Sequence, residues 1–262
     1  MGGHGSDVGS NLAALVRRAA ERDPDHPALI AGAATLRWGE LDAAVDRAAA
    51  ALRGLGLAPG DRVALQLGNT LDFPVLYFGT LRAGLVAVPA NTGYTRPELS
   101  YLLADAGASA LVTSSVATIE SAGELRAAVG TLRHVLVAAP SGPDGTQPLS
   151  ALLSAAPARL DGEPGRGGED LAVLMYTSGT SGRPRGAMLS HRALLANLAQ
   201  LAAIRPAVVT GADVLLLALP LFHVYGLNPG LGMVAWAGAT GVLVERFDPA
   251  ETLALLARHR VT

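Results

Sequence analysis

Apolar residues recur along the chain in two alternating patterns, one with the period of a helix and one of short continuous runs typical of buried strands. In residues 39–55, for example, Leu41, Val45, Ala48 and Leu52 share one helical face. The helical pattern predicts helices over residues 11–22, 39–55, 71–82, 97–106, 119–129, 149–154, 191–201, 227–237 and 249–259. The apolar runs predict strands over residues 28–30, 35–38, 62–67, 85–89, 110–113, 134–138, 171–175, 214–219 and 239–244.

This alternation predicts the fold class. Parallel strands need crossover connections, which helices supply, so we expect an α/β protein whose layered, mostly parallel sheets are covered by helices. Residues 28–30 and 35–38 flank Gly32 and instead predict a hairpin. Loop-forming glycine and proline residues interrupt the alternation in the middle of the chain. We therefore divide the chain into a first α/β subdomain (residues 1–139), a loop-rich excursion (residues 140–169) and the start of a second α/β subdomain (residues 170–262).

The most apolar stretch, residues 224–244, has about the length of a membrane span. It contains Asn228, Pro229 and several glycines, and it ends in a strand-like run at residues 242–244. We therefore predict a buried helix followed by a buried strand, and no transmembrane segment. The N-terminus lacks a basic region followed by an apolar one, so we expect no secretory signal and a cytoplasmic protein.

The composition excludes several kinds of site and partner. Half of the 262 residues are hydrophobic, which is enough for a substantial core, and the net charge of −2 provides no basic field for nucleic acid. The absence of cysteine excludes disulfides and thiolate metal sites from this chain. All 20 basic residues are arginine, so no side-chain amine is present. The six histidines are dispersed without ligand spacing, and we predict no metal site.

Residues 174–186 carry the strongest functional signal. The apolar run at residues 171–175 leads into a loop of small and hydroxyl-bearing residues, and Arg185 follows it. The loop consists of Thr177, Ser178, Gly179, Thr180, Ser181 and Gly182. Small residues let the backbone approach an anion, hydroxyl and amide groups donate to its oxygens, and an arginine adds a charge-assisted contact. The sequence does not fit the Walker pattern, and the alternative is an ordinary glycine- and serine-rich turn.

The loop resembles the nucleotide-phosphate loop of the adenylate-forming enzymes, which include acyl-CoA synthetases, peptide-synthetase adenylation domains and luciferases. Residues 69–112 are similar to the early half of an acyl-CoA synthetase, and residues 220–226 (Pro-Leu-Phe-His-Val-Tyr-Gly) to the segment beside its acyl pocket. Residues 245–249 and 257–261 continue the resemblance in the right order. The fatty-acyl-CoA ligases are the most similar branch. The resemblance implies an incomplete N-terminal part of the adenylate-forming fold.

The resemblance also implies a reaction. A carboxylate attacks the α-phosphorus of ATP, pyrophosphate leaves, and coenzyme A then displaces AMP from the acyl-adenylate, with Mg²⁺ assisting at the phosphates. The six loop residues and Arg185, which stands where many relatives have lysine, would hold the β- and γ-phosphates. His223 would lie beside the acyl-adenylate and orient it; the alternative is a buried or half-buried histidine at a helix start with satisfied nitrogens. Tyr225, Gly226 and Leu227 are weaker candidates for the pocket wall.

Several family motifs are absent from this sequence. The adenine-binding Tyr-Gly-x-Thr-Glu segment, the ribose-binding aspartate and the mobile C-terminal domain with its lysine are missing. The predicted helix at residues 249–259 leads toward a strand that does not follow, which leaves an unfinished βαβ unit. We therefore expect the N-terminal portion of an ATP-dependent acid–thiol ligase of fatty acid metabolism that does not complete a turnover alone. The alternative is a non-catalytic module that binds nucleotide or pairs with a partner, and self-association or pairing with a C-terminal piece is expected.

Overall fold

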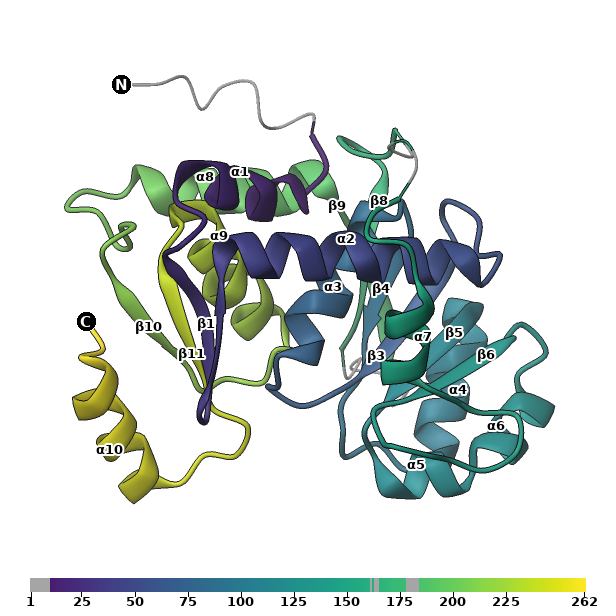
Figure 1. Ribbon diagram of the computed structural model, residues 1–262. Coiled ribbons are helices and arrows are strands. Elements are labelled where there is room, and N and C mark those ends of the chain that lie inside the picture. Colours follow the sequence, from purple (N-terminus) through teal and green to yellow (C-terminus); the bar gives the residue numbers. More distant parts are fainter. Residues whose placement is uncertain (1–9, 161, 163–164, 178–183) are drawn as a thin grey trace.

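The computed structural model describes residues 10–160, 162, 165–177 and 184–262 (Figure 1). Its strands are β1 (Pro27–Ala31), β2 (Ala34–Arg37), β3 (Arg62–Gln66), β4 (Val86–Pro89), β5 (Ala108–Thr113), β6 (His134–Val137), β7 (Gln147–Pro148), β8 (Leu171–Thr177), β9 (Arg185–Ser190), β10 (Val214–Leu217) and β11 (Thr240–Leu243). Its α-helices are α1 (Ala14–Arg22), α2 (Trp38–Gly54), α3 (Asp72–Arg82), α4 (Arg96–Ala106), α5 (Val116–Glu120), α6 (Ala122–Ala128), α7 (Leu149–Ala155), α8 (His191–Ala203), α9 (Met233–Ala237) and α10 (Pro249–His259). A π-helix, η2 (Gly226–Gly232), precedes α9.

The described strands form two sheets. The smaller sheet has the order β10-β11-β1-β2, and the larger one has the order β7-β6-β5-β3-β4-β8-β9. Neighbouring strands are parallel except in the hairpins β1–β2 and β8–β9. The prediction of mostly parallel sheets covered by helices is therefore confirmed, as is the first hairpin. The three-part division at residues 139 and 169 stays a prediction.

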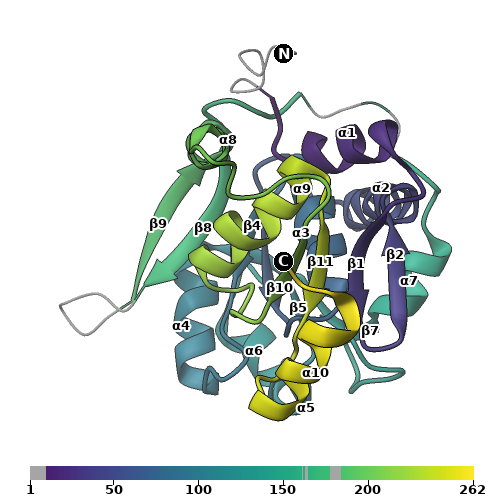
Figure 2. The ribbon, with the colours of Figure 1, turned by 90° about the vertical axis from the view of Figure 1, so that its left-hand side faces the viewer.

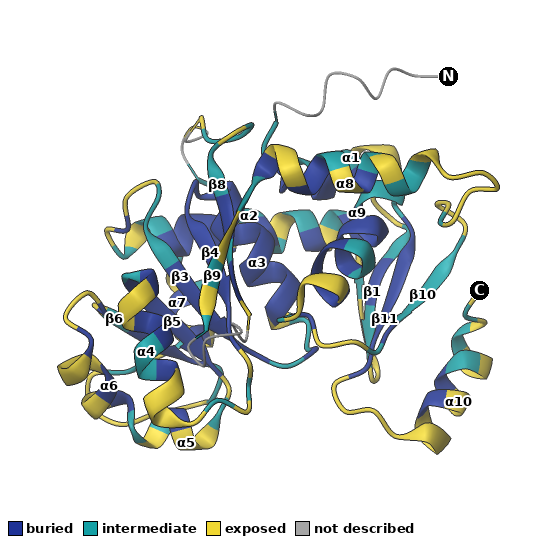
Figure 3. Cartoon of the chain, turned by 180° about the vertical axis from the view of Figure 1, so that it is seen from behind, coloured by how far each residue is buried: buried dark blue, intermediate teal, exposed yellow. Residues whose placement is uncertain are grey.

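Helices α2 and α3 lie between the two sheets, and α4, α5 and α6 cover the other face of the larger sheet (Figure 1). The strand pattern explains this layering, because successive side chains of a strand point to opposite faces. In β3, Val63 and Leu65 join the core around α2 and α3, whereas Ala64 joins the core under α4 and α6. In β5, Val112 joins the core around α2 and α3, and Leu111 joins the core under α4 and α6. Both faces of the central strands β3, β4 and β5 are thus buried, as Figure 3 shows.

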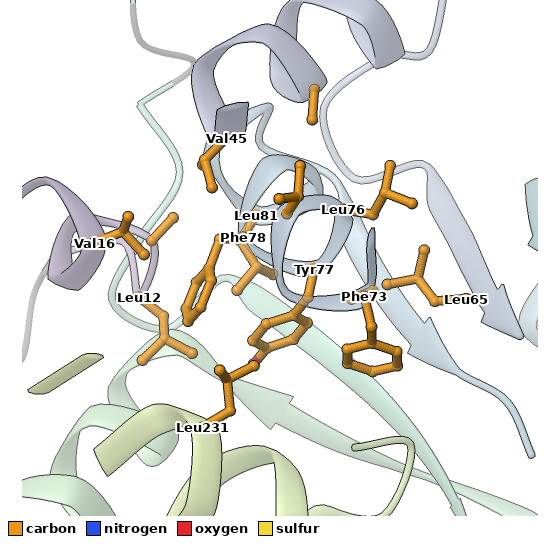
Figure 4. Close-up of a cluster of buried hydrophobic side chains, with 14 of the residues drawn as sticks. Leu12, Val16, Val45, Leu65, Phe73, Leu76, Tyr77, Phe78, Leu81 and Leu231 are labelled. Atoms are coloured by element: carbon orange, nitrogen blue, oxygen red, sulfur yellow. The ribbon is translucent and has the colours of Figure 1, made fainter. Parts of the chain in front are cut away.

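Helix α3 is mostly apolar and is buried from Phe73 to Arg82, as expected for a helix between two layers. Phe73 and Tyr77 stack with their ring centroids 6.3 Å apart, and Phe78 lies against Tyr77 at 5.1 Å (Figure 4). Leu12 from the segment before α1 and Leu231 from η2 close around the same rings (Figure 4). This cluster therefore joins α3 to elements from both ends of the chain.

One charged side chain lies in this layer. Arg82 at the end of α3 is 8% exposed, and its guanidinium contacts Asp42 at 2.6 Å and Asp46 at 2.8 Å, both on α2. Arg82 also donates a hydrogen bond to the carbonyl of Ala13. Since a buried charge is costly unless it is paired, the two carboxylates allow an arginine here. The cluster fixes α3 against α2 and the start of α1.

One strand was not predicted and two local predictions were wrong. The segment between the loop and the helix at residue 191 forms strand β9, antiparallel to β8. The helix predicted over residues 119–129 is divided into α5 and α6 at Ser121, whose hydroxyl donates to the carbonyl of Ala117 at 2.8 Å and so competes with the helical pattern. The first half of the helix predicted over residues 227–237 is the π-helix η2, which contains Pro229, a residue without a backbone N–H.

Residues 224–244 otherwise fold as predicted, with a helical segment followed by the buried strand β11. In the part of the chain that the structure describes, none of the helices combines the length and the apolar character needed to cross a bilayer.

Candidate functional site

The hairpin of β8 and β9 presents the two ends of the predicted phosphate loop. Thr177, the last residue of β8, pairs directly with Arg185, the first residue of β9, and both side chains are exposed. Ser178, Gly179, Thr180, Ser181 and Gly182 lie outside the described residues. Because β8 is parallel to β4, Thr177 lies at the carboxyl edge of the larger sheet, where open α/β sheets bind ligands. Figure 2 shows this hairpin at the border of the sheet.

Helix α4 contacts both arms of the hairpin. The hydroxyl of Tyr176 donates to Asp105 at 2.5 Å, and the hydroxyl of Tyr101 donates to the carbonyl of Pro184 at 3.2 Å. Residues four positions apart share a helix face, so Tyr101 and Asp105 approach the hairpin side by side. Burial, and then the neighbouring Asp105 carboxylate, raise the pKa of Tyr176, which keeps the phenol protonated as the donor. The arms on either side of residues 178–183 are therefore held by one helix.

His223 lies on the segment that joins β10 to η2. Its backbone N–H donates to the carbonyl of Pro220 at 3.0 Å, and its carbonyl accepts from Leu227 at 2.9 Å. The ring is exposed, and Nδ1 accepts a hydrogen bond from the backbone N–H of Tyr225 at 3.3 Å. A neutral imidazole whose Nδ1 accepts carries its proton on Nε2. The ring is more exposed than the alternative interpretation expects, although His223 stands directly before a helical turn and one ring nitrogen has a partner. Its role toward a ligand stays a prediction.

Asn69 holds this segment. It follows β3 of the larger sheet and is 4% exposed. Its Nδ2 donates to the carbonyls of Leu217 at 3.0 Å and Leu219 at 2.9 Å, and its Oδ1 accepts from the N–H of Leu221 at 2.9 Å. Sequence reasoning did not select Asn69 as a site residue. The Gly68-Asn69 pair directly after a buried strand was the signal, since such positions lie at the carboxyl edge of a sheet.

An apolar cavity of about 200 Å³ lies beside η2. Among the predicted pocket residues, Tyr225 and Gly226 line it, whereas Leu227 is buried in the core and does not. The other lining residues come from α8 and the segment after it, from β10 and the segment after it, and from η2 and α9: Leu201, Val208, Val209, Leu215, Leu216, Leu217, Leu219, Pro229, Gly230 and Met233. The lining is mostly aliphatic, so the cavity suits a hydrocarbon group.

Taken together, the structure brings Thr177 and Arg185 together on the larger sheet, and it places His223 on a segment of the smaller sheet. Asn69 connects the two, because it extends from the larger sheet to the backbone that leads to His223. Within the residues described, no group of three histidine or carboxylate side chains is arranged to hold a metal ion. The prediction of no metal site stays a prediction.

Comparisons with known proteins agree with this geometry. Residues 16–262 match the family described as AMP-binding enzyme. The 4-coumarate–CoA ligase 5 of Oryza sativa subsp. japonica is 36% identical over 249 residues, which cover 91% of this chain and 44% of the relative. The long-chain-fatty-acid–CoA ligase of Salmonella typhimurium is 35% identical over 260 residues, which cover 89% of this chain and 46% of the relative.

Among solved structures, the apo crystal structure of MatB from Rhodopseudomonas palustris superposes with a TM-score of 0.83 at 35% identity and covers 95% of this chain and 48% of that one. The chain thus spans about half the length of the relatives that it matches. Because the family match extends over nearly the whole sequence and the fold agrees with it, the chain belongs to the AMP-binding enzymes, the adenylate-forming family that includes the CoA ligases.

Proposed function

We propose that this chain is the N-terminal portion of an ATP-dependent acid–CoA ligase, which activates a carboxylic acid as its acyl-adenylate and transfers the acyl group to coenzyme A. The observation that carries the proposal is the β8–β9 hairpin, which sets Thr177 and Arg185 opposite one another at the carboxyl edge of the larger sheet. The family match supports it. The names of the two ligases reported above include an aromatic acid and a long-chain fatty acid.

In the first step, a carboxylate oxygen forms a bond to the α-phosphorus of ATP while the bond to pyrophosphate breaks. Negative charge gathers on the departing phosphates, so donors fixed at that position favour the transition state. Thr177, Ser178, Gly179, Thr180, Ser181, Gly182 and Arg185 are the donors that we assign to this role. The described residues provide no cluster of histidine or carboxylate side chains that could hold Mg²⁺.

His223 and the apolar cavity are assigned to the acid. The exposed ring donates from Nε2 toward the acid carboxylate or the acyl-adenylate carbonyl and so orients it. The aliphatic lining beside Tyr225 takes the hydrocarbon part of the acid. A cavity of this character favours a fatty acid over a charged or polar one, because polar groups lose hydration there without gaining partners.

Nucleotide binding by the 262-residue chain tests the phosphate role. The chain is titrated with a fluorescent ATP analogue, and Arg185→Ala is compared with Arg185→Lys and with Arg258→Ala, an exposed arginine on α10. A lost charge-assisted hydrogen bond is worth about 1.5–3 kcal/mol, so Arg185→Ala weakens binding by roughly 10- to 150-fold. Arg185→Lys keeps the charge and part of the affinity, and Arg258→Ala binds as the unmodified chain does. Equal affinity in all three variants, or no binding by the unmodified chain, refutes the assignment.

Turnover is a separate question. We expect no steady-state acyl-CoA formation by this chain alone, since the family's catalytic lysine has no counterpart in a sequence without lysine. ATP–pyrophosphate exchange measured with and without an added C-terminal piece of a related ligase distinguishes the candidates. Exchange that depends on the added piece supports the ligase. Nucleotide binding without exchange under both conditions supports a non-catalytic binding module instead.

A further inference from the structure

We propose that Asn69 is a positioning residue for His223: its side chain fixes the backbone of residues 217–226, the His223 strap, and thereby sets the direction and tautomer of the imidazole. The role of His223 toward the acid rests on the function proposed above. The hold of Asn69 on the strap does not, because it follows from contacts within the chain.

The Asn69 side chain is nearly fully used. A primary amide has two N–H donors and one carbonyl acceptor, and both kinds of group find partners on the strap. Nδ2 donates to the carbonyls of Leu217 and Leu219 at 3.0 and 2.9 Å, and Oδ1 accepts from Leu221 at 2.9 Å. Two acceptors on one side and one donor on the other determine the amide orientation, because the flipped amide would set oxygen against two carbonyls.

These bonds hold the strap where it leaves the sheet. Strand β10 ends at Leu217, whose carbonyl also accepts from the N–H of Val244 just after β11, and beyond it the chain bends at Leu219 and turns at Leu221. The bonded residues 217, 219 and 221 lie two apart, so the one amide of Asn69 fixes three backbone groups across this bend. His223 comes two residues after the last of these bonds.

The start of η2 also contacts the strap. A Cβ on Gly226 would lie 3.0 Å from the carbonyl oxygen of Leu219 and closer still to that of Pro220, so η2 begins in direct contact with the same segment. The N–H of His223 also donates to Pro220 at 3.0 Å. Because Asn69 and the start of η2 both contact this backbone, the turn that carries His223 has little freedom. Its Nδ1 is then held near the N–H of Tyr225, which leaves the proton on Nε2.

Asn69 links the two sheets. It follows β3 of the larger sheet, which also carries the β8–β9 hairpin, whereas His223 lies on the segment that follows β10 of the smaller sheet. A side chain from one sheet that is bonded to the backbone of the other keeps the two candidate binding groups in register. Small displacements at such sites reduce catalysis strongly, which is why the supporting residue matters.

The experiment uses the whole 262-residue chain and four variants. Asn69→Asp keeps the acceptor for Leu221 but turns oxygen toward two carbonyls, and Asn69→Ser keeps one short donor and acceptor. Leu125→Ala is the matched control, since it removes buried volume under α6 on the far face of the larger sheet. His223→Gln assigns the signal of the His223 ring in two-bond proton–nitrogen NMR spectra. Thermal unfolding identifies variants that remain folded.

The unmodified chain is expected to show His223 as the Nε2–H tautomer. Both Asn69 variants shift this signal toward a mixture of tautomers, and Leu125→Ala leaves it unchanged at a similar loss of thermal stability. The affinity for dodecanoyl-sulfamoyl-adenosine, a stable acyl-adenylate analogue, falls about tenfold in Asn69→Asp, whereas ATP affinity does not change. The proposal is overturned when the His223 signal in both Asn69 variants coincides with that of the unmodified chain, or when Leu125→Ala shifts it equally. Absence of ATP binding by the unmodified chain refutes the proposed function instead, and the NMR comparison still decides the role of Asn69.

Discussion

A buried histidine should make the stability of this protein depend on pH. His191, the first residue of α8, is 1% exposed, and its Nδ1 accepts a hydrogen bond from the backbone N–H of Leu12 at 3.0 Å. The pKa of His191 is lowered to about 4, chiefly by burial, since the imidazolium would lose its hydration. The nearby Asp170 opposes this shift, and Arg166 adds to it. Protonation would also place a donor against the Leu12 N–H. The folded protein therefore requires the neutral ring.

The sign and size of this pH dependence follow from the difference in proton binding between the folded and the unfolded chain. Between pH 6.5 and 4 the unfolded chain holds a proton on this histidine and the folded chain does not, so stability is complete above pH 6.5 and decreases as the pH falls toward 4. A shift of this extent corresponds to about 3 kcal/mol in total at ~1.4 kcal/mol per pH unit. Between pH 7.5 and 5 the loss from His191 is about 2 kcal/mol.

Urea unfolding followed by circular dichroism at several pH values measures this loss. His191→Asn offers an acceptor without a titrating ring, so it should be less stable at pH 7.5 but lose about 2 kcal/mol less than the unmodified chain on going to pH 5. Leu194→Ala, a buried neighbour on α8, lowers stability by a similar amount at every pH. His134, whose pKa is also lowered by burial, contributes equally to all three proteins and cancels. Parallel pH profiles for His191→Asn and the unmodified chain would refute the reasoning.

Substitutions at a buried ion pair and at two glycines test the packing. Arg82→Ala removes the Arg82 cation from the half-buried carboxylates of Asp42 and Asp46, of which Asp46 keeps its pair with Arg17, and should cost about 3–5 kcal/mol in urea unfolding. Combining it with both Asp→Asn changes should recover part of this loss, and full additivity would contradict the pairing. Gly226→Ala drives a methyl group into backbone carbonyls of the strap and should destabilise by at least about 1–3 kcal/mol. Gly54→Ala, at the end of α2 with open space around it, should be neutral or stabilise by up to ~1 kcal/mol, and a loss at both glycines would show that contact is not the cause.

The sequence was informative wherever a local pattern decides the structure. Alternating apolar runs and helical faces located most of the strands and helices, including α10 at its observed bounds. Strand β9 escaped prediction because its side chains are exposed or half-buried, so no apolar alternation marks it. Its structure depends on pairing with β8, which single-sequence patterns do not encode.

The same distinction applies to the site. The hydroxyl- and glycine-rich loop is contiguous, so its composition alone indicated an anion site. Asn69 was not predicted, because its partners lie about 150 residues away and one side chain leaves no periodic trace. His191 was predicted only as the first residue of the helix over residues 191–201. Its burial and its hydrogen bond to Leu12, 179 residues earlier, exist only in the folded chain. Long-range contacts of single polar residues therefore cannot be predicted from the sequence pattern.

The placement of the first hairpin has a consequence for synthesis on the ribosome. Strand β1 pairs in parallel with β11, and the register joins Leu29 to Gly241. The central strands β3, β4, β5 and β6 of the larger sheet are all translated before residue 138, so they can associate while the later half is still being made. The early hairpin, in contrast, must wait with an unpaired apolar edge until β11 emerges. Nascent chains paused in that interval are where premature aggregation and chaperone capture should concentrate.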